Sequence, residues 1–276
     1  LKILLFLRPL DHEKMLKFFV DILKLCPELQ KSIWNEKFFN LNLDGKEFIT
    51  IEFMASINLC LKIITLPIVS APTDAFQYSL MTCCQSSLSR QLLGKLLSNT
   101  SLMVKYYAVL LCLALFDRFG RIINGKIITD SDELDEFNVQ FHRRVPEFQA
   151  IQTIYNSISL SKSSISCQLL VTKLFCLIRF YLDYFQSSSF LEIKFDPFKY
   201  LLEKYDSITN DILLSLLPLL SVCPFKVLEK RNGKSVLRLI FNLFPNFPCL
   251  FEQLVDFVFK NKNISEPFEC QQDLYF

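Results

Sequence analysis

The sequence predicts an all-α protein, specifically an α-solenoid of divergent HEAT- or armadillo-like helical hairpins that forms a single region over residues 1–276. Apolar residues recur at helical spacing along nearly the whole chain, and no segment alternates convincingly between apolar and polar as a strand would. The chain has 5 glycines in 276 residues, which argues against a fold rich in tight β-turns. Because 51% of the residues are hydrophobic, the chain can bury enough apolar surface to offset the entropy of ordering, which excludes a disordered protein.

In the first half of the chain, capping residues and prolines mark the ends of the predicted helices. Asp11 is suited to cap the first helix, which ends before Pro27, and Pro67 ends the second. The helix that follows Ser101 is apolar on nearly all sides, so we expect it to be buried on more than one side. The helices predicted for this half lie at about 11–25, 50–66, 73–84, 87–97, 102–119 and 132–144.

The second half shows the same kinds of signal. Pro146 separates two helices, and Asp196 followed by Pro197 is typical of a cap and first helical turn. We expect Pro218 to kink the helix that contains it. The helices predicted for this half lie at about 147–160, 164–186, 197–205, 209–222, 234–244, 247–260 and 266–275.

Successive helices joined by short polar breaks are typical of stacked helical hairpins. No strict repeat is visible, so the repeats would be divergent, with about 40 to 47 residues per unit as in HEAT and armadillo proteins. The segment SLSRQLLGKLLSNTSLMVKYYAVLLCLALF, residues 87–116, fits such a unit best. It contains a leucine-striped helix, a polar turn and a second helix with an early cation.

The ten cysteines do not predict a disulfide scaffold or a metal centre. Several lie inside apolar helical patterns, where a reduced cysteine acts as a small hydrophobic side chain. The chain has two histidines, His12 and His142, and no Cys/His spacing suited to zinc. We therefore predict reduced core thiols in an intracellular protein, with no metal and no cofactor. The cysteines in apolar patterns are Cys60, Cys112, Cys167 and Cys176.

The apolar runs do not predict a membrane span. A run such as 106–116 falls short of the roughly 18 residues that a span requires. The first residue is Leu1 and no cleavage site follows LKILLFLRPL, so we expect a piece of a longer protein and not a signal peptide.

Two short segments partly match phosphate-binding loops. GRIINGKI, residues 120–127, matches G-x-x-x-x-G-K, but Ile127 stands where a Ser or Thr would bind magnesium, and the segment follows a predicted helix instead of a strand. NGKS, residues 232–235, has Leu228 at the first glycine position. We interpret both segments as turns. The acidic residues of 132–136 form a solvated helix face and no catalytic triad is recognisable, so we predict no enzyme.

FHRRVPEF, residues 141–148, is best explained as a joint between two helices. Pro146 stops one helix and starts the next, Phe141 and Phe148 pack the junction, and Arg143 with Arg144 suits the carboxyl end of the first helix. Solvation is the simplest role for the surface cations. A second hypothesis is that Arg143, Arg144 and a second basic group bind RNA or a partner weakly. A solenoid can align several modest basic patches along one surface, where they contact RNA phosphates. The second basic group contains Lys226, Lys230, Arg231, Lys234 and Arg238.

Several segments together resemble the amino-terminal region of the nucleolar pre-ribosomal-associated protein 1 family. They are EKMLKFFVDILKLCPELQKSIW, FITIEFMASINLCLKIITLPI, SLMVKYYAVLLCLALFDRF, DELDEFNVQFHRRVPEFQAIQTIY and LLPLLSVCPFKVLEKRNGKSVLRLIFNL. No one of them is unique to the family, and the resemblance depends on their order and spacing over roughly residues 13–276.

The resemblance implies a large helical-repeat scaffold of the nucleolus that acts early in the assembly of the large ribosomal subunit. It implies assembly-factor partners, including a DEAD-box helicase, and contact with precursor ribosomal RNA. It implies no catalytic residues and no cofactor. We also predict no membrane partner and no small-molecule substrate. The alternative is a HEAT-type adaptor in transport or trafficking with no RNA role. A basic surface that joins 143–144 to 226–238 would favour the scaffold, and a continuous apolar groove would favour the adaptor.

Overall fold

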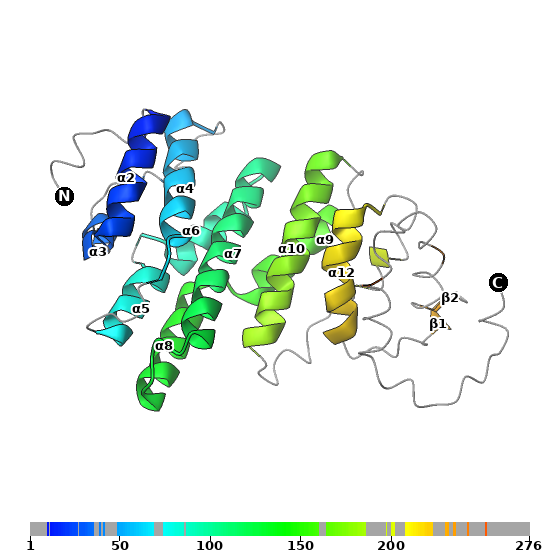
Figure 1. Cartoon of the computed structure of the whole chain (residues 1–276). Coiled ribbons are helices and arrows are strands. Elements are labelled where there is room, and N and C mark those ends of the chain that lie inside the picture. The colour runs from blue at the N-terminus through cyan, green and yellow to red at the C-terminus, as the bar shows by residue number, and fades with distance from the viewer. Residues whose placement is uncertain are drawn as a thin grey trace. The chain divides into compact units, whose positions relative to one another are not determined.

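The computed structural model divides into two compact units, Leu1–Ile154 and Tyr155–Phe276 (Figure 1). The boundary falls inside one helix, α9, Phe148–Ser159. The described residues are 10, 12–26, 28–35, 39, 41, 49–68, 74–85, 87–159, 164–185, 197, 200–201, 208–222, 230–231, 234–235, 242 and 252. Within these ranges the regular secondary structure is helical apart from one small β-ladder, so the predicted all-α class is confirmed.

The first unit is a set of helices that pack on helices one to three positions away along the chain. Helix α4 contacts both α2 and α7, α5 contacts α7 and α8, and α6 contacts α7 (Figure 1). The long helix α7 therefore lies against α4, α5 and α6, and rings of α8 also stack on it, as the apolar character on nearly all its sides predicts. The helices are α2 Glu13–Leu25, α3 Glu28–Asn35, α4 Ile51–Ile64, α5 Ala75–Cys83, α6 Arg90–Leu97, α7 Leu102–Asn124 and α8 Ser131–Arg144.

The second unit contains α10, Ile165–Tyr184, and α12, Asn210–Val222, which pack against each other. Pro218 lies inside α12, as predicted. A short antiparallel ladder pairs β1, Lys230–Arg231, with β2, Lys234–Ser235. The prediction of a helix over 234–244 and of no sheet is thus wrong at Lys234 and Ser235, because an Asn-Gly pair between two chain segments favours a hairpin.

Side-chain caps define where many helices begin. The Thr50 hydroxyl accepts from the Phe53 amide at 3.1 Å, and the Asp74 carboxylate accepts from the Gln77 amide at 2.9 Å. The hydroxyls of Ser89 and Ser164 cap α6 and α10 in the same way. Each cap satisfies an amide that has no partner inside its helix, which is why Ser, Thr and Asp at these positions are usable start signals.

Two helix limits differ from the prediction. Helix α7 continues to Asn124, past the predicted end near 119, because burial of Ile122 outweighs the cost of a glycine inside the helix. The prediction also omits α3. It takes Pro27 only as the end of the preceding helix, although a proline also suits the start of the next one. Helix α3 buries Ile33 and Trp34. The Asp11 cap, most of the 197–205 helix and the predicted helix 266–275 lie outside the described residues. Of the predicted helices 234–244 and 247–260, only 234–235, 242 and 252 are described, and 242 and 252 are helical.

Candidate functional site at the α8–α9 joint

The FHRRVPEF segment connects α8 to α9, as the sequence predicts. Helix α8 ends at Arg144, and the Val145 amide closes its last turn by donating to the Phe141 carbonyl at 3.1 Å. Helix α9 begins at Phe148. The side chain of Phe141 is fully buried and that of Phe148 nearly so, which confirms that aromatic residues pack this junction.

Phe141 anchors the end of α8 on α7 through an aromatic cluster. Its ring stacks on that of Phe119 with 4.1 Å between centroids, and meets the ring of Phe116 edge-on at 5.3 Å. Phe137, one turn earlier in α8, also stacks on Phe119, with 5.3 Å between centroids. Such pairs stabilise a protein beyond their buried area, so the joint is fixed to the core of the first unit.

Arg90, the first residue of α6, closes the joint from outside. Its Nε donates to the Val145 carbonyl at 2.9 Å, and its Nη2 donates to the His142 carbonyl. Its Nη1 forms an ion pair with Glu147 Oε1 at 3.2 Å. Arg90 thus supplies donors to carbonyls at the end of α8, which have no partner within their own helix.

The structure therefore corrects part of the predicted role of Arg143 and Arg144. Both lie in the last turn of α8, where a cation is favourable, but Arg90 binds the carbonyls at this helix end. Arg143 is exposed and Arg144 is partly buried. Neither side chain makes a hydrogen bond or ion pair with any residue that the structure describes. Sequence inspection could not find Arg90, because more than 50 residues separate it from the carbonyls it binds.

His142 is not suited to act as a strong base. Partial burial and the neighbouring Arg90 lower the pKa of its imidazole, and Glu147 opposes this effect. The histidine is therefore uncharged at neutral pH, and the cationic character of the joint comes from the arginines. Arg144 lies near Cys84 of the α5 end, where burial raises the pKa of the thiol to about 12 against the lowering effect of that arginine.

The second predicted basic group lies in the other unit. Lys230 and Arg231 form β1 and Lys234 begins β2, with Arg231 paired to Lys234 in the ladder. Lys226 and Arg238 lie outside the described residues. Arg143 and Arg144 belong to the first unit, so the predicted convergence of the two groups remains a prediction.

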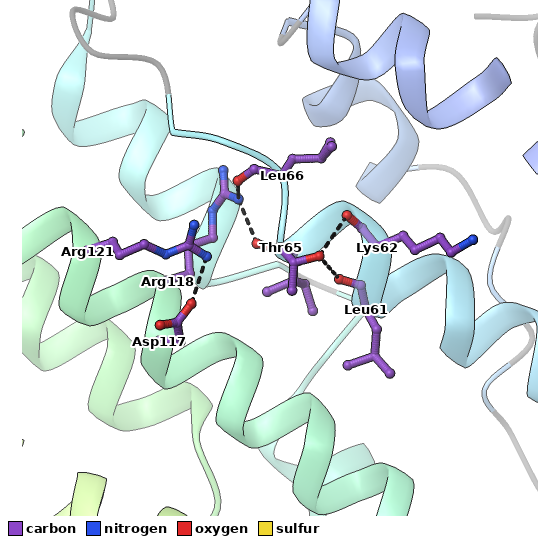
Figure 2. Close-up of polar contacts among 8 residues, drawn as sticks. Leu61, Lys62, Thr65, Leu66, Asp117, Arg118 and Arg121 are labelled. Carbon is purple, nitrogen blue, oxygen red and sulfur yellow. Dashed lines mark hydrogen bonds and ion pairs between the residues drawn. The ribbon is translucent and has the colours of Figure 1, made fainter. Parts of the chain in front are cut away.

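A second structural arginine, Arg118, was not recognised from the sequence. It is completely buried in α7, and Figure 2 shows it reaching the segment that ends α4. Its Nη1 donates to the carbonyls of Ile64 at 2.7 Å and Leu66 at 2.9 Å, and its Nη2 donates to Tyr78 Oη at 3.2 Å. Burial lowers the pKa of the guanidinium. Its burial could have been predicted from its position, because it lies at helical spacing in the buried stripe of Leu111, Leu115 and Ile122.

Arg118 and Arg90 serve the same purpose at two places. Each lies on a neighbouring helix and binds carbonyls at the carboxyl end of another helix. A guanidinium suits this task because it presents several donors in a fixed fork. By contrast, Arg121 pairs with Asp117 on the helix surface at 2.8 Å (Figure 2). The first unit is thus held together partly by arginines between helices.

The predicted turn of 120–127 is mostly helix. Residues 120–124 complete α7, and the helix closes with the Ile127 amide donating to the Ile122 carbonyl at 3.2 Å. Lys126 has a positive φ of 49°, as the residue after a helix end often does. This geometry differs from a phosphate-binding loop, in which the glycines precede the helix.

All the described cysteines are free, and Cys60, Cys83, Cys112 and Cys167 are buried as core thiols are. Cys84 and Cys176 are half-buried and Cys26 is exposed. Burial raises the pKa of Cys83 and of Cys112 to about 12, so these thiols stay protonated and unreactive at neutral pH. Among the described residues no group of three His, Cys, Asp or Glu side chains is placed to hold a metal ion.

Helix α10 is long and apolar enough to span a membrane by length and composition alone. The run 106–116 is too short for this. Helix α10 has 20 residues with a mean hydropathy of 1.6 in its most apolar window, and 44% of that window is buried. Its buried face includes Leu170, Leu174 and Leu177, and α12 packs against it within the second unit. The core helix of a helical unit shows the same pattern.

Replacing Arg90 tests its role at the joint. We expect Arg90→Ala to lower the free energy of unfolding by about 1–2 kcal/mol, because two helix-end carbonyls and Glu147 lose a donor that is partly exposed. Arg90→Lys keeps the charge but not the fork, so it should recover less than half of the loss. Urea unfolding measures this, with Lys95→Ala on the exposed face of the same helix as the control. Equal stability of the Arg90→Ala and Lys95→Ala variants would contradict the assignment.

The comparisons with known proteins add no relative: the chain matches no protein-family model, no curated protein and no solved structure.

Proposed function

We propose that this chain is a non-catalytic scaffold of the nucleolus that acts in early assembly and precursor-RNA processing of the large ribosomal subunit. In this role its HEAT-like helical stack holds assembly proteins, including a DEAD-box helicase, and contacts precursor ribosomal RNA. The resemblance of its segments to the nucleolar pre-ribosomal-associated protein 1 family supports this assignment. The joint between α8 and α9 supports it independently.

The observation that best supports an RNA role is that Arg90, and not Arg143 or Arg144, binds the carbonyls at the end of α8. Arg90 binds the carbonyls of His142 and Val145, so Arg143 is not required to close the helix. Arg143 is exposed, and its side chain has no hydrogen bond or ion pair with any described residue. A guanidinium with unused donors is well suited to bidentate contact with a phosphate group. Arg143 and Arg144 are therefore the first candidates for RNA contact.

A second candidate function is a protein adaptor with no RNA role. Helix α2 carries exposed apolar side chains one to two turns apart on its outer side, Met15 at 39%, Phe18 at 53% and Leu25 at 83% exposure. Exposed apolar stripes of this kind mark protein interaction surfaces. This observation favours an adaptor if no RNA binding is found.

The double variant Arg143→Ala/Arg144→Ala separates the two functions. If the arginines contact RNA phosphates, affinity falls to a similar degree for unrelated RNA sequences, and the log–log salt slope flattens by roughly one to two units, at about 0.7 to 0.9 per lost contact. Stability should fall by at most about 1 kcal/mol, since Arg90 still closes the joint. Salt-titrated RNA binding and thermal melts measure both effects.

Lys14→Ala/Lys17→Ala is the matched control, because it removes the same charge from an exposed surface of α2. It should change affinity and slope less than the arginine variant. If the Arg143→Ala/Arg144→Ala variant binds RNA with the same affinity and the same salt slope as the unmodified chain, these two residues do not belong to an RNA site.

A further inference from the structure

The outer face of α8 has its charges segregated along the helix. Asp132, Glu136, Val139 and Arg143 follow one another at spacings of four, three and four residues, so they share one line on the helix surface. Asp132, Glu136 and Arg143 are exposed, and Val139 is 49% exposed. The opposite side of α8 is the one that packs, through Phe137 and Phe141. The outer face is therefore acidic in its first half and basic at its end.

These charges are not neutralised within the part of the molecule that the structure describes. No acid and base of α8 stand three or four residues apart, which is the spacing that ion pairs within a helix require. None of the α8 residues Asp132, Glu133, Asp135, Glu136, Arg143 and Arg144 forms an ion pair with any residue that the structure describes. The helix dipole explains acids in the first turn and bases in the last, but Asp135 and Glu136 lie beyond the first turn.

We propose that α8 is a self-association surface that pairs antiparallel with α8 of a second copy of this chain. Asp132 and Arg143 are 11 residues apart, so an antiparallel helix centred between residues 137 and 138 places Asp132 opposite Arg143 of the second copy, and the reverse. In the same register Glu133 faces the second copy's His142, and near the centre of the contact Val139 faces the second copy's Glu136. A parallel pairing would oppose like charges. The self-complementary pattern therefore selects both the partner and its direction.

This association is independent of the RNA role proposed above, although both use Arg143. Exposed ion pairs contribute little individually and are screened by salt, so we expect a weak dimer that dissociates as salt rises. RNA and a second copy should compete for Arg143. Asp132, in contrast, belongs to the association alone, so Asp132→Arg weakens pairing without weakening RNA binding.

Charge exchange provides the test, by sedimentation equilibrium of the whole chain at low salt over a wide concentration range. Asp132→Arg alone and Arg143→Asp alone should each weaken dimerisation about tenfold or more, because each places like charges opposite one another twice by symmetry. An equimolar mixture of the two variants should recover association, since each variant then supplies the charge the other lacks. The double variant Asp132→Arg/Arg143→Asp should recover it as well.

Recovery of association in the double variant would show that intermolecular charge pairing, and not the helix dipole, causes the effects of the single substitutions. Both substitutions oppose the dipole, so the double variant should melt at a lower temperature than either single variant even as its association recovers. Circular dichroism confirms that each variant is folded. A chain that stays monomeric at every concentration, or a dimer that neither single exchange weakens, would overturn the proposal. So would failure of the mixed variants to associate.

Discussion

Arg118→Ala is expected to lower the free energy of unfolding by about 3–5 kcal/mol, the largest effect of any substitution considered for this chain. The side chain is completely buried and donates to the carbonyls of Ile64 and Leu66 and to the hydroxyl of Tyr78. Removing it takes this donor away from the two carbonyls and opens a cavity beside α7. Both effects destabilise the folded state.

A graded series distinguishes the two contributions. Arg118→Met fills most of the volume but still leaves the carbonyls without a donor, so it should recover only part of the loss. Arg121→Ala, three residues later in the same helix, removes an ion pair whose side chains are 39% and 54% exposed, and should cost less than about 1 kcal/mol. Chemical unfolding of the three variants measures the series. Equal stability of Arg118→Ala and Arg121→Ala would be inconsistent with the buried contacts.

Phe141→Ala is expected to cost about 3–4 kcal/mol, because its ring is fully buried against two phenylalanines of α7. The substitution removes the contact that holds the end of α8 on α7. Protection of the α8 amides from hydrogen exchange should therefore fall together with global stability. Phe18→Ala is the control, since that ring is 53% exposed in α2 and should cost much less. A loss of equal size in both variants would show that Phe141 does not have this special role.

Features set by local chemistry were predictable from the sequence. Thr50, Asp74, Ser89 and Ser164 precede apolar helical patterns, and each accepts from an amide in the first turn of its helix. The joint at Pro146 was predictable for the same reason, because proline and the flanking phenylalanines act on their immediate neighbours. In all these cases the cause and its effect lie within about four residues.

Features set by contacts between distant segments were not predictable. Arg90 looks like an ordinary first-turn cation, and its acceptors lie 52 and 55 residues away. The extension of α7 to Asn124 depends on burial of Ile122 against other helices. The β1–β2 ladder was not predicted although its Asn-Gly pair is a local signal, because the apolar residues after Ser235 also fit a helix. Arg118 is an intermediate case. Its helical spacing indicates burial, but its acceptors, the carbonyls at the end of α4, could not be predicted.

We propose that the end of α8 supplies Arg143 and Arg144 for contact with precursor ribosomal RNA, while Arg90 stabilises the joint between α8 and α9. The most direct measurement is crosslinking in cells, purification of the whole chain and sequencing of the attached RNA, for the unmodified protein and for Arg143→Ala/Arg144→Ala. We predict enrichment of precursor ribosomal RNA with the unmodified protein and a clear reduction with the variant, while assembly proteins still co-purify with both. Recovery of assembly or transport proteins without precursor ribosomal RNA, or equal RNA recovery from both proteins, would contradict the claim.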